Sequence, residues 1–448
     1  MSDPSMNAPR TGPTLIRAVG LWALAASIFN VTVGAGIFRL PGLGAEMLGA
    51  AAPLAYLICA VAMGLIVLCF AEAGSRVART GGPYAYVEVV FGPFAGFLAG
   101  VLLWLMGTLA MAGVSIFFVG NLASVAPALG SGVARVLVLA ALLGFFTWVN
   151  VRGVRQGTRL IEVASVAKLL PLVLLIVLAL PAVRGANLAI HEWPAAATLS
   201  RASIVIIFAF MGVESALVPS GEVRDPARTV PGAIAIAMIG VTVLYIATQV
   251  VAQGVLGAGL ATSGEAPLAT VAAAALGGWG RTLIVAGAAI SMFGYVSGMT
   301  LAIPRALFAF AEDGILPRAV AAVHPRYRTP WVAIIVQSVI VFLVAVTSTF
   351  EQLAVIANLS ALLLYGVCAI AAWELRRRGV RMEGTSPLTL PLGPTVHVLT
   401  LVVIGFLLTS IKWNEWAMVL GVLAVASLRF VVGRPRRAAA PVVLESAG

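Results

Sequence analysis

The sequence predicts an all-α polytopic membrane protein with 12 transmembrane helices, built as a 5+5 inverted repeat with interrupted helices 1 and 6. The first observation is composition: of the 448 residues 61% are hydrophobic and only 10% are charged, with a mean hydropathy of +1.06. No soluble globular domain is this apolar. At ~20 residues for each crossing, the chain has room for about a dozen spans. The second observation is that glycines interrupt two apolar segments that lie five segments apart.

Twelve apolar segments follow one another, each long enough to cross a ~30 Å hydrocarbon core at ~1.5 Å per residue. The first, third and eighth are long, which implies tilt or irregularity. Two further pieces, Gly81–Phe91 and Pro267–Leu276, look like re-entrant or surface helices. The twelve segments run over residues 18–48, 51–73, 92–120, 132–150, 159–181, 201–221, 230–254, 279–310, 330–348, 351–373, 395–411 and 414–432.

These segments divide the chain into five parts, two of which are short polar tails. Helices 1–5 form the first repeat, and helix 6 opens the second repeat, which helices 7–10 complete. Helices 11 and 12 lie outside both repeats. The parts are an N-terminal tail at 1–17, helices 1–6 at 18–221 (helix 6 at 201–221), helices 7–10 at 222–373, helices 11–12 with the preceding loop at 374–432, and a C-terminal tail at 433–448.

Arginine sets the expected orientation of the chain. Arginines gather in alternate loops, such as Arg76 and Arg79 after segment two and Arg376 and Arg377 after segment ten. By the positive-inside rule both termini then lie in the cytoplasm, and we expect a multi-pass protein of the plasma (inner) membrane. The net charge of +11 follows from these loops, so we expect a lipid bilayer and no nucleic acid as partner.

The interrupted segments predict a polar binding site at mid-membrane. Gly34, Ala35 and Gly36 stand in the middle of segment one, and Gly212 stands in segment six. Each glycine weakens a helix by roughly 1 kcal/mol relative to Ala. A broken helix in lipid exposes N–H and C=O groups, which transporters use to bind ions and substrates between inverted repeats. The alternative is that these glycines are only close-packing positions between helices.

Lys168 is the most informative charged residue. It lies nine residues past Arg159, so ~13 Å into the bilayer at helical rise. The chain has 28 basic residues, and only Lys168 and Lys412 are lysine. A buried lysine can lose its proton, whereas arginine cannot, and its amine can stand where a sodium ion would bind helix-end carbonyls. The alternative is a lysine that snorkels to the interface.

Other candidate side chains surround the second interruption. Glu214 follows Gly212 and is either a proton carrier or gate residue, or a carboxylate that caps the second half-helix. Phe208 lies one turn before Gly212 and is either an aromatic lid over a substrate or a packing residue. Met106, Met111 and Met299 either line an adaptable apolar pocket or pack in the core.

The motifs of the common enzyme classes are absent from the sequence. It has no Walker loop, no HExxH and no GxSxG, and its three histidines fall in loops or at span edges. The three cysteines lie within apolar runs and suggest packing. We therefore expect a protein that is not an enzyme, with no cofactor and no metal site.

Several blocks resemble the amino acid–polyamine–organocation (APC) transporter superfamily, and they span most of the chain. The blocks are GAGIFRLPG (34–42), AEAGSRVARTGGPYAYVEVVFGPFAGF (71–97), FAFMGVESALVPSGEVRDPARTVP (208–231), PRALFAFAEDGILP (304–317) and HPRYRTPWVAI (324–334). The resemblance implies the five-plus-five fold and a secondary transporter of amino acids or close relatives.

The resemblance also implies where a substrate binds. An α-carboxylate would meet N–H groups around Ala35, Gly36 and Ile37. The α-amine would meet carbonyls near Thr32 and around Phe208 to Met211. Lys168 matches a lysine of sodium-independent members whose amine approaches the first helix near Gly34 and a polar residue of segment eight, here Ser297. The implied substrate positions are Thr32, Gly34, Ala35, Gly36, Ile37, Met106, Phe208, Met211, Gly212 and Met299, with Lys168, Glu214 and Ser297 for coupling or gating.

The sequence therefore predicts a sodium-independent amino acid transporter that works by alternating access. It would couple to protons or exchange one amino acid for another. Glu214 is the only acidic residue among the site positions, which favours neutral over cationic substrates. The alternatives are a polyamine or organic-amine exchanger and, from another class, a membrane amino acid sensor. The tails are too short for the cytoplasmic domain of most sensors, and a mid-membrane half-helix site suits occlusion better than the conduction of a channel.

Overall fold

The computed structural model describes residues 20–77, 83–153, 158–212, 226–381, 387–390 and 393–433, and every regular element within these ranges is helical. All twelve predicted apolar segments contain helix. The elements are α1 Leu21–Thr32, η2 Gly36–Phe38, α2 Leu40–Leu48, η3 Gly49–Ala51, α3 Ala52–Arg76, α4 Pro83–Phe91, α5 Pro93–Ala123, η4 Pro127–Gly130, α6 Gly132–Val151, α7 Thr158–Ala179, η5 Leu180–Ala182, η6 Gly185–Leu188, α8 Ala196–Ile206, η7 Ile207–Phe210, α9 Pro226–Leu256, η10 Gly257–Leu260, α10 Pro267–Leu276, α11 Gly278–Ala302, α12 Pro304–Glu312, η11 Arg318–Ala321, α13 Trp331–Thr347, α14 Phe350–Arg377, α15 Thr395–Leu408 and α16 Trp413–Gly433.

The helices of the described residues have the length and composition of membrane spans. Seven helical stretches are long and apolar enough to cross a bilayer, and six shorter apolar helices accompany them. One stretch, Leu40–Arg76, joins α2 and α3, although Gly49 separates them with a φ of 55° and a ψ of −131°. The prediction of an all-α polytopic membrane protein is confirmed, and twelve crossings in two inverted repeats stay a prediction.

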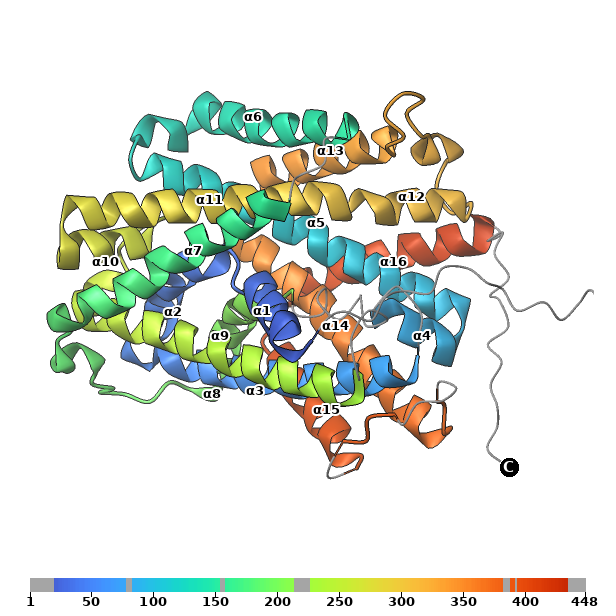
Figure 1. Ribbon diagram of the computed structural model, residues 1–448, viewed down its shortest axis with the longest axis horizontal. Helices are drawn as coiled ribbons and strands as arrows, with labels where there is room; N and C mark the ends of the chain where they lie inside the picture. Colours follow the sequence, from blue (N-terminus) through green and yellow to red (C-terminus); the bar gives the residue numbers. More distant parts are fainter. Residues whose placement is uncertain are drawn as a thin grey trace, which may run out of the picture.

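The long eighth segment contains two helices in place of one. α11 ends at Ala302, and α12 begins at Pro304. A proline has no N–H, so it cannot donate the helical hydrogen bond to the carbonyl four residues earlier, here that of Thr300. The two helices nevertheless continue in nearly the same direction (Figure 1).

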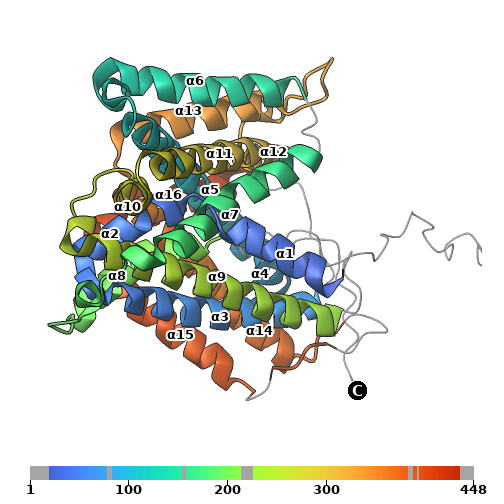
Figure 2. The same cartoon turned by 60° about the vertical axis from the view of Figure 1, so that its left-hand side comes forward.

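α5 and α14 form the centre of the bundle. They pack against each other, and 78% of the apolar window of each is buried, against 22% for α6 and 6% for α16. Both views show α6 beside α13 at one edge of the molecule, and α15 at the opposite edge (Figures 1 and 2). The exposed apolar side chains of the outer helices are suited to lipid.

The two ends of the bundle carry different elements. α10 lies at one end, which we call the α10 end (Figure 1). α12 and the last residues of α16 lie at the other, where a Cβ built on Gly433 would lie 3.1 Å from the carbonyl oxygen of Gly314, which follows α12. We call this the α12 end. By the predicted orientation the α10 end faces outward and the α12 end faces the cytoplasm.

Candidate functional site

The first predicted interruption is present in the structure. α1 ends at Thr32, and Val33 leaves helical geometry with a ψ of 84°. Gly34 and Ala35 follow without regular α-helix, and α2 does not begin until Leu40. The break is largely buried among helices, as the cost of unsatisfied backbone groups requires.

Three successive backbone N–H groups at this break have no acceptor among the described residues. The Phe38 N–H donates to the Ala35 carbonyl at 3.2 Å, and the Arg39 N–H donates to the Gly36 carbonyl at 3.0 Å. The N–H groups of Ala35, Gly36 and Ile37 donate to no atom of the residues that the structure describes. Buried N–H groups almost always have a partner, so three donors in a row without one among the described residues make this break a candidate site for a bound acceptor.

The second interruption ends the helical run of α8 and η7. Met211 is extended with a ψ of 152°, and Gly212 has a φ of 107°, a conformation that favours glycine. Residue 213 and those after it up to 225 lie outside the described residues, and Glu214 is among them. The structure therefore describes the entry to this break, and the predicted second half-helix lies outside the described residues.

The two breaks are in direct contact. A Cβ atom built on Gly36 would lie 3.3 Å from Cδ1 of Phe208 and 3.6 Å from Cα of Ala209. Gly36 is thus a position where the absence of a side chain allows η2 to approach η7. Segments that are far apart in the sequence meet here, as expected for a site formed between two interrupted helices.

Tyr245 on α9 joins the two breaks. Its buried hydroxyl lies 2.9 Å from the Thr32 carbonyl and 2.8 Å from the Ala209 carbonyl. A phenol has one hydrogen, so it donates to one carbonyl at a time. The Gly34 N–H also donates to the Thr32 carbonyl at 2.8 Å, so Thr32 keeps a donor when Tyr245 donates to Ala209. We missed Tyr245 in the sequence, where the available signal was a tyrosine in mid-segment whose hydroxyl needs a partner.

Lys168 on α7 reaches the C-terminal end of α1. Its amine donates to the Asn30 carbonyl, two residues before α1 ends. A cation at the C-terminal end of a helix is stabilised by the helix dipole. The resemblance implied an approach near Gly34, and the structure places the contact four residues earlier on the same half-helix. Ser297 is buried on α11, a helix that packs against α7.

An aromatic cluster covers the second break. The Phe208 ring packs edge to face on Phe350 at 5.3 Å between centroids, and Phe350 stacks on Phe117 at 3.7 Å. Phe350 is the first residue of α14, so the cluster joins η7, α14 and α5. Gly113 makes room for it, because a Cβ there would lie 3.1 Å from Cδ2 of Phe350. Phe117 and Phe350 are residues that we did not single out in the sequence.

Two of the three predicted pocket methionines, Met106 and Met299, lie on the α5, α11 and α14 side of the core. Met106 is buried, with its sulfur 4.0 Å from the hydroxyl oxygen of Tyr365. Cε of Met299 would lie 3.4 Å from a Cβ built on Gly107. The structure thus brings Thr32, Gly36 and Phe208 together at the two breaks, which Tyr245 joins. Lys168 contacts the end of α1 from α7, and the two methionines lie on α5 and α11.

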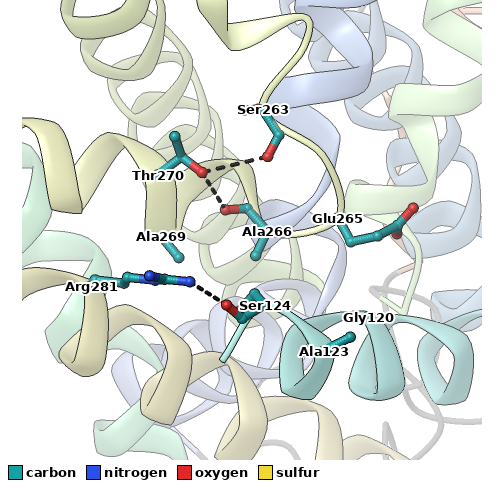
Figure 3. Close-up of a pocket in the computed structure, with 9 residues that line it drawn as sticks. All are labelled: Gly120, Ala123, Ser124, Ser263, Glu265, Ala266, Ala269, Thr270 and Arg281. Atoms are coloured by element: carbon teal, nitrogen blue, oxygen red, sulfur yellow. Dashed lines mark hydrogen bonds between the residues drawn. The ribbon is translucent and has the colours of Figure 1, made fainter. Parts of the chain in front are cut away.

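A hollow of about 320 Å³ lies at the α10 end (Figure 3). The polar residues that line it are Glu265, Arg281, Ser124, Ser263 and Thr270. Small residues, among them Gly120 and Ala123, complete the lining (Figure 3). Its lining includes none of the residues of the two breaks, and we did not predict it from the sequence.

Comparisons with known proteins agree with this architecture. Residues 19–425 match the family model described as amino acid permease. The serine/threonine exchanger SteT of Bacillus subtilis is 29% identical over 403 residues, which cover 88% of this chain and 91% of SteT. The branched-chain amino acid permease BcaP of the same organism is 24% identical over 89% of each chain, and its methylthioribose transporter is 25% identical over 95% of each chain. Because one family model spans nearly the whole bundle, the chain belongs to the amino acid permease family of the APC superfamily.

Proposed function

We propose that the protein is a sodium-independent secondary transporter of amino acids that works by alternating access. It moves neutral amino acids in preference to cationic ones, by proton coupling or by exchange. The observation that carries this proposal is the run of N–H groups at Ala35, Gly36 and Ile37 that have no acceptor in the part of the chain that the structure describes, in contact with the second break. The relatives SteT and BcaP, which are named for amino acids, support the substrate class.

The free N–H groups suit the carboxylate of a zwitterion. They lie just before α2, where the positive end of the helix dipole adds to their attraction for an anion. The ammonium group would meet the carbonyls of Thr32 and Ala209. When Tyr245 donates to Ala209 and the Gly34 N–H donates to Thr32, each carbonyl keeps one lone pair for the ammonium group. Phe208, Met106, Met211 and Met299 would line the space for the side chain.

Lys168 supports the sodium-independent part of the proposal. Its amine already holds the carbonyl of Asn30 at the end of α1, where the negative end of the helix dipole favours a cation. A covalently attached ammonium group there makes a sodium ion unnecessary. Glu214 and Ser297 complete the set of residues that we propose for coupling and gating.

Uptake into proteoliposomes tests this function. We expect labelled serine or leucine to enter liposomes preloaded with the same amino acid, or to follow an imposed pH gradient. The rate should not change when choline replaces sodium. Stimulation by sodium would contradict the proposal. Competition by putrescine but not by leucine or serine would favour the organic-amine exchanger, and competition by methylthioribose alone would remove the amino acid assignment.

Substitution of the lysine tests its role. We expect Lys168→Ala to cut uptake at least tenfold while the protein still inserts and purifies as wild type, because no cation then holds the end of α1. Lys412→Ala is the matched control, since Lys412 is the other lysine of the chain and its side chain is exposed. Wild-type uptake by Lys168→Ala would rule out a role for its amine.

A further inference from the structure

The hollow at the α10 end is closed on its inner side by an ion pair. Nε of Arg39 lies 3.5 Å from Oε2 of Glu265, and an Nη atom of Arg39 also donates to the Gly264 carbonyl. Glu265 lines the hollow, and Arg39 is the residue that joins η2 to α2. The pair therefore connects the loop before α10 to the backbone segment that follows the first break.

A closed seam continues from the hollow toward the break. Phe38, Arg39, Asn121 and Met292 line it, and it shares Glu265 with the hollow, together with Ala266 and Ala269. Its free volume is about 10 Å³, too little for more than one water molecule. Phe38 belongs to η2, so the seam leads from the hollow to the first break. It is closed in this structure.

We propose that the hollow is the outer vestibule of the transport pathway and that the Arg39–Glu265 ion pair is the latch that closes it from the first break. The role of the hollow as a vestibule rests on the proposed transport function. The path from the hollow to the first break rests on the geometry alone. When the pair separates, the loop before α10 can leave α2 and the seam between Phe38 and Met292 can widen.

Close packing at two glycines positions the loop that carries Glu265. A Cβ built on Gly42 of α2 would lie 3.0 Å from Cβ of Pro267, the first residue of α10. A Cβ built on Gly120 of α5 would lie 3.1 Å from Cβ of Glu265. Two glycines thus let the Glu265 loop settle against α2 and α5. Arg281 is engaged elsewhere, because its guanidinium donates to the Ser124 carbonyl (Figure 3).

The latch is suited to repeated opening. The side chain of Glu265 is 57% exposed and that of Arg39 is 16% exposed, so water solvates the carboxylate when the pair separates. Exposed ion pairs contribute little net stability, which is the property that a gate in frequent use requires. The second bond of Arg39, to the Gly264 carbonyl, adds to the closed state independently of the carboxylate.

Accessibility of a single cysteine in the seam tests the latch. The native Cys59, Cys69 and Cys368 are replaced by alanine, and Ala288→Cys places a thiol in the closed seam. A membrane-impermeant thiol reagent is applied to intact cells and to inverted vesicles. Ala123→Cys, in the open hollow, shows which preparation exposes the α10 end. Labelling is measured without any amino acid present, so the result does not depend on transport.

We expect Glu265→Gln to raise the labelling rate of Ala288→Cys roughly twofold to fivefold, the range that loss of an exposed ion pair supports. Arg39→Gln should raise it further, because it removes both bonds of the guanidinium. The matched control is Glu351→Gln, which removes a carboxylate that is 50% exposed and lies 3.7 Å from Arg201. It should label as slowly as the parent.

Equal labelling of Glu265→Gln, Arg39→Gln and the Glu351→Gln control would overturn the latch. The charge-exchanged Arg39→Glu, Glu265→Arg double variant should label slowly again, and it shows that faster labelling comes from the lost pair and not from misfolding. If these labelling results hold while liposomes take up no amino acid, the proposed function fails and the latch stands.

Discussion

Tyr245 is the residue on which the junction of the two breaks depends most directly. Its ring is held by Tyr56 and Phe210 in edge-to-face contacts, with centroids 6.2 Å and 5.1 Å away. That packing fixes the hydroxyl between the Thr32 and Ala209 carbonyls. The tyrosine thus stabilises a local backbone conformation that neither interrupted helix can hold by itself.

Removal of that hydroxyl should destabilise the protein. We expect Tyr245→Phe to lower the free energy of unfolding by about 1–3 kcal/mol, because a buried carbonyl then loses its donor. The measurement is thermal unfolding of the purified protein in detergent. Tyr56→Phe is the matched control: Tyr56 is equally buried on the neighbouring helix, and its hydroxyl has no hydrogen-bond partner among the described residues. Equal melting temperatures of the two variants would contradict the role of Tyr245.

A methyl group at Gly36 should separate the two breaks. Its Cβ would lie 3.2 Å from Cδ1 of Leu40 and 3.3 Å from Cδ1 of Phe208, so both side chains must move. We expect Gly36→Ala to reduce uptake at least tenfold, since the free N–H groups then shift relative to η7. Gly64→Ala on α3 is the control, because a Cβ there meets nothing within 4 Å. Unchanged uptake by Gly36→Ala would show that the contact between the breaks is not needed.

At the scale of residues, the sequence revealed the irregular positions better than their partners. Gly34 and Gly36 stand out because glycine is unfavourable in a helix, and Lys168 stands out because charge is costly in lipid. Their partners are ordinary residues in apolar runs. Asn30, Tyr245 and Phe350 become visible only when the fold brings them to the breaks, since no local pattern marks a contact across more than a hundred residues.

At the scale of elements, Glu72 ties three helices together at the α12 end. Its side chain is fully buried on α3, with Oε1 lying 3.2 Å from Nη2 of Arg76 and 3.4 Å from Nη1 of Arg376 on α14. Its other oxygen, Oε2, lies 3.4 Å from Nε2 of the buried His397 on α15. A carboxylate with two arginines is the centre of this helix junction.

Neutralising Glu72 should loosen that junction. We expect Glu72→Gln to lower the free energy of unfolding by about 3–5 kcal/mol, because two guanidinium groups lose their buried counter-charge. Thermal unfolding in detergent is the readout. Glu374→Gln serves as control, since Glu374 also pairs with two arginines, Arg377 at 2.9 Å and Arg378 at 2.7 Å, but at the surface. Surface pairs contribute little, so this variant should melt close to wild type.

Element boundaries followed from the sequence with small errors. The short helix predicted at Pro267–Leu276 has these bounds in the structure, because a proline begins it and Gly277, with a φ of 80°, ends it. The predicted segment 201–221 begins late, since α8 starts at Ala196. The residues from Ala196 to Ser200 are short and partly polar, so hydropathy alone gave no signal for this first turn.

At the scale of the whole molecule, the composition determined the class, and the arrangement of the helices needed coordinates. Apolar runs predict spans without tertiary information, because lipid forces every backbone group to bond within its own helix. They cannot show that α5 and α14 lie at the centre while α16 lies outside, since all three are equally apolar. The hollow at the α10 end was missed for the same reason, as its walls come from three separate loops and helix ends.

The predicted crossing pattern has a direct test. Residues 192 and 318 are separated by segments six, seven and eight, an odd number of crossings, so they should lie on opposite sides of the membrane. We expect Glu192→Cys to react with an impermeant thiol reagent in intact cells, and Arg318→Cys to react only after permeabilisation. The three native cysteines are buried, so background labelling should be low. Reaction of both positions from one side would refute the twelve-span count.

The bond between Lys168 and the end of α1 also bears on energy coupling. A metal ion enters with its cargo and departs with it, so each cycle draws on the gradient of that ion. An ammonium tethered by four methylene groups swings with its helix yet never leaves the protein. We therefore expect net accumulation to derive from protons or from the counter-flow of another solute, and never from the sodium-motive force.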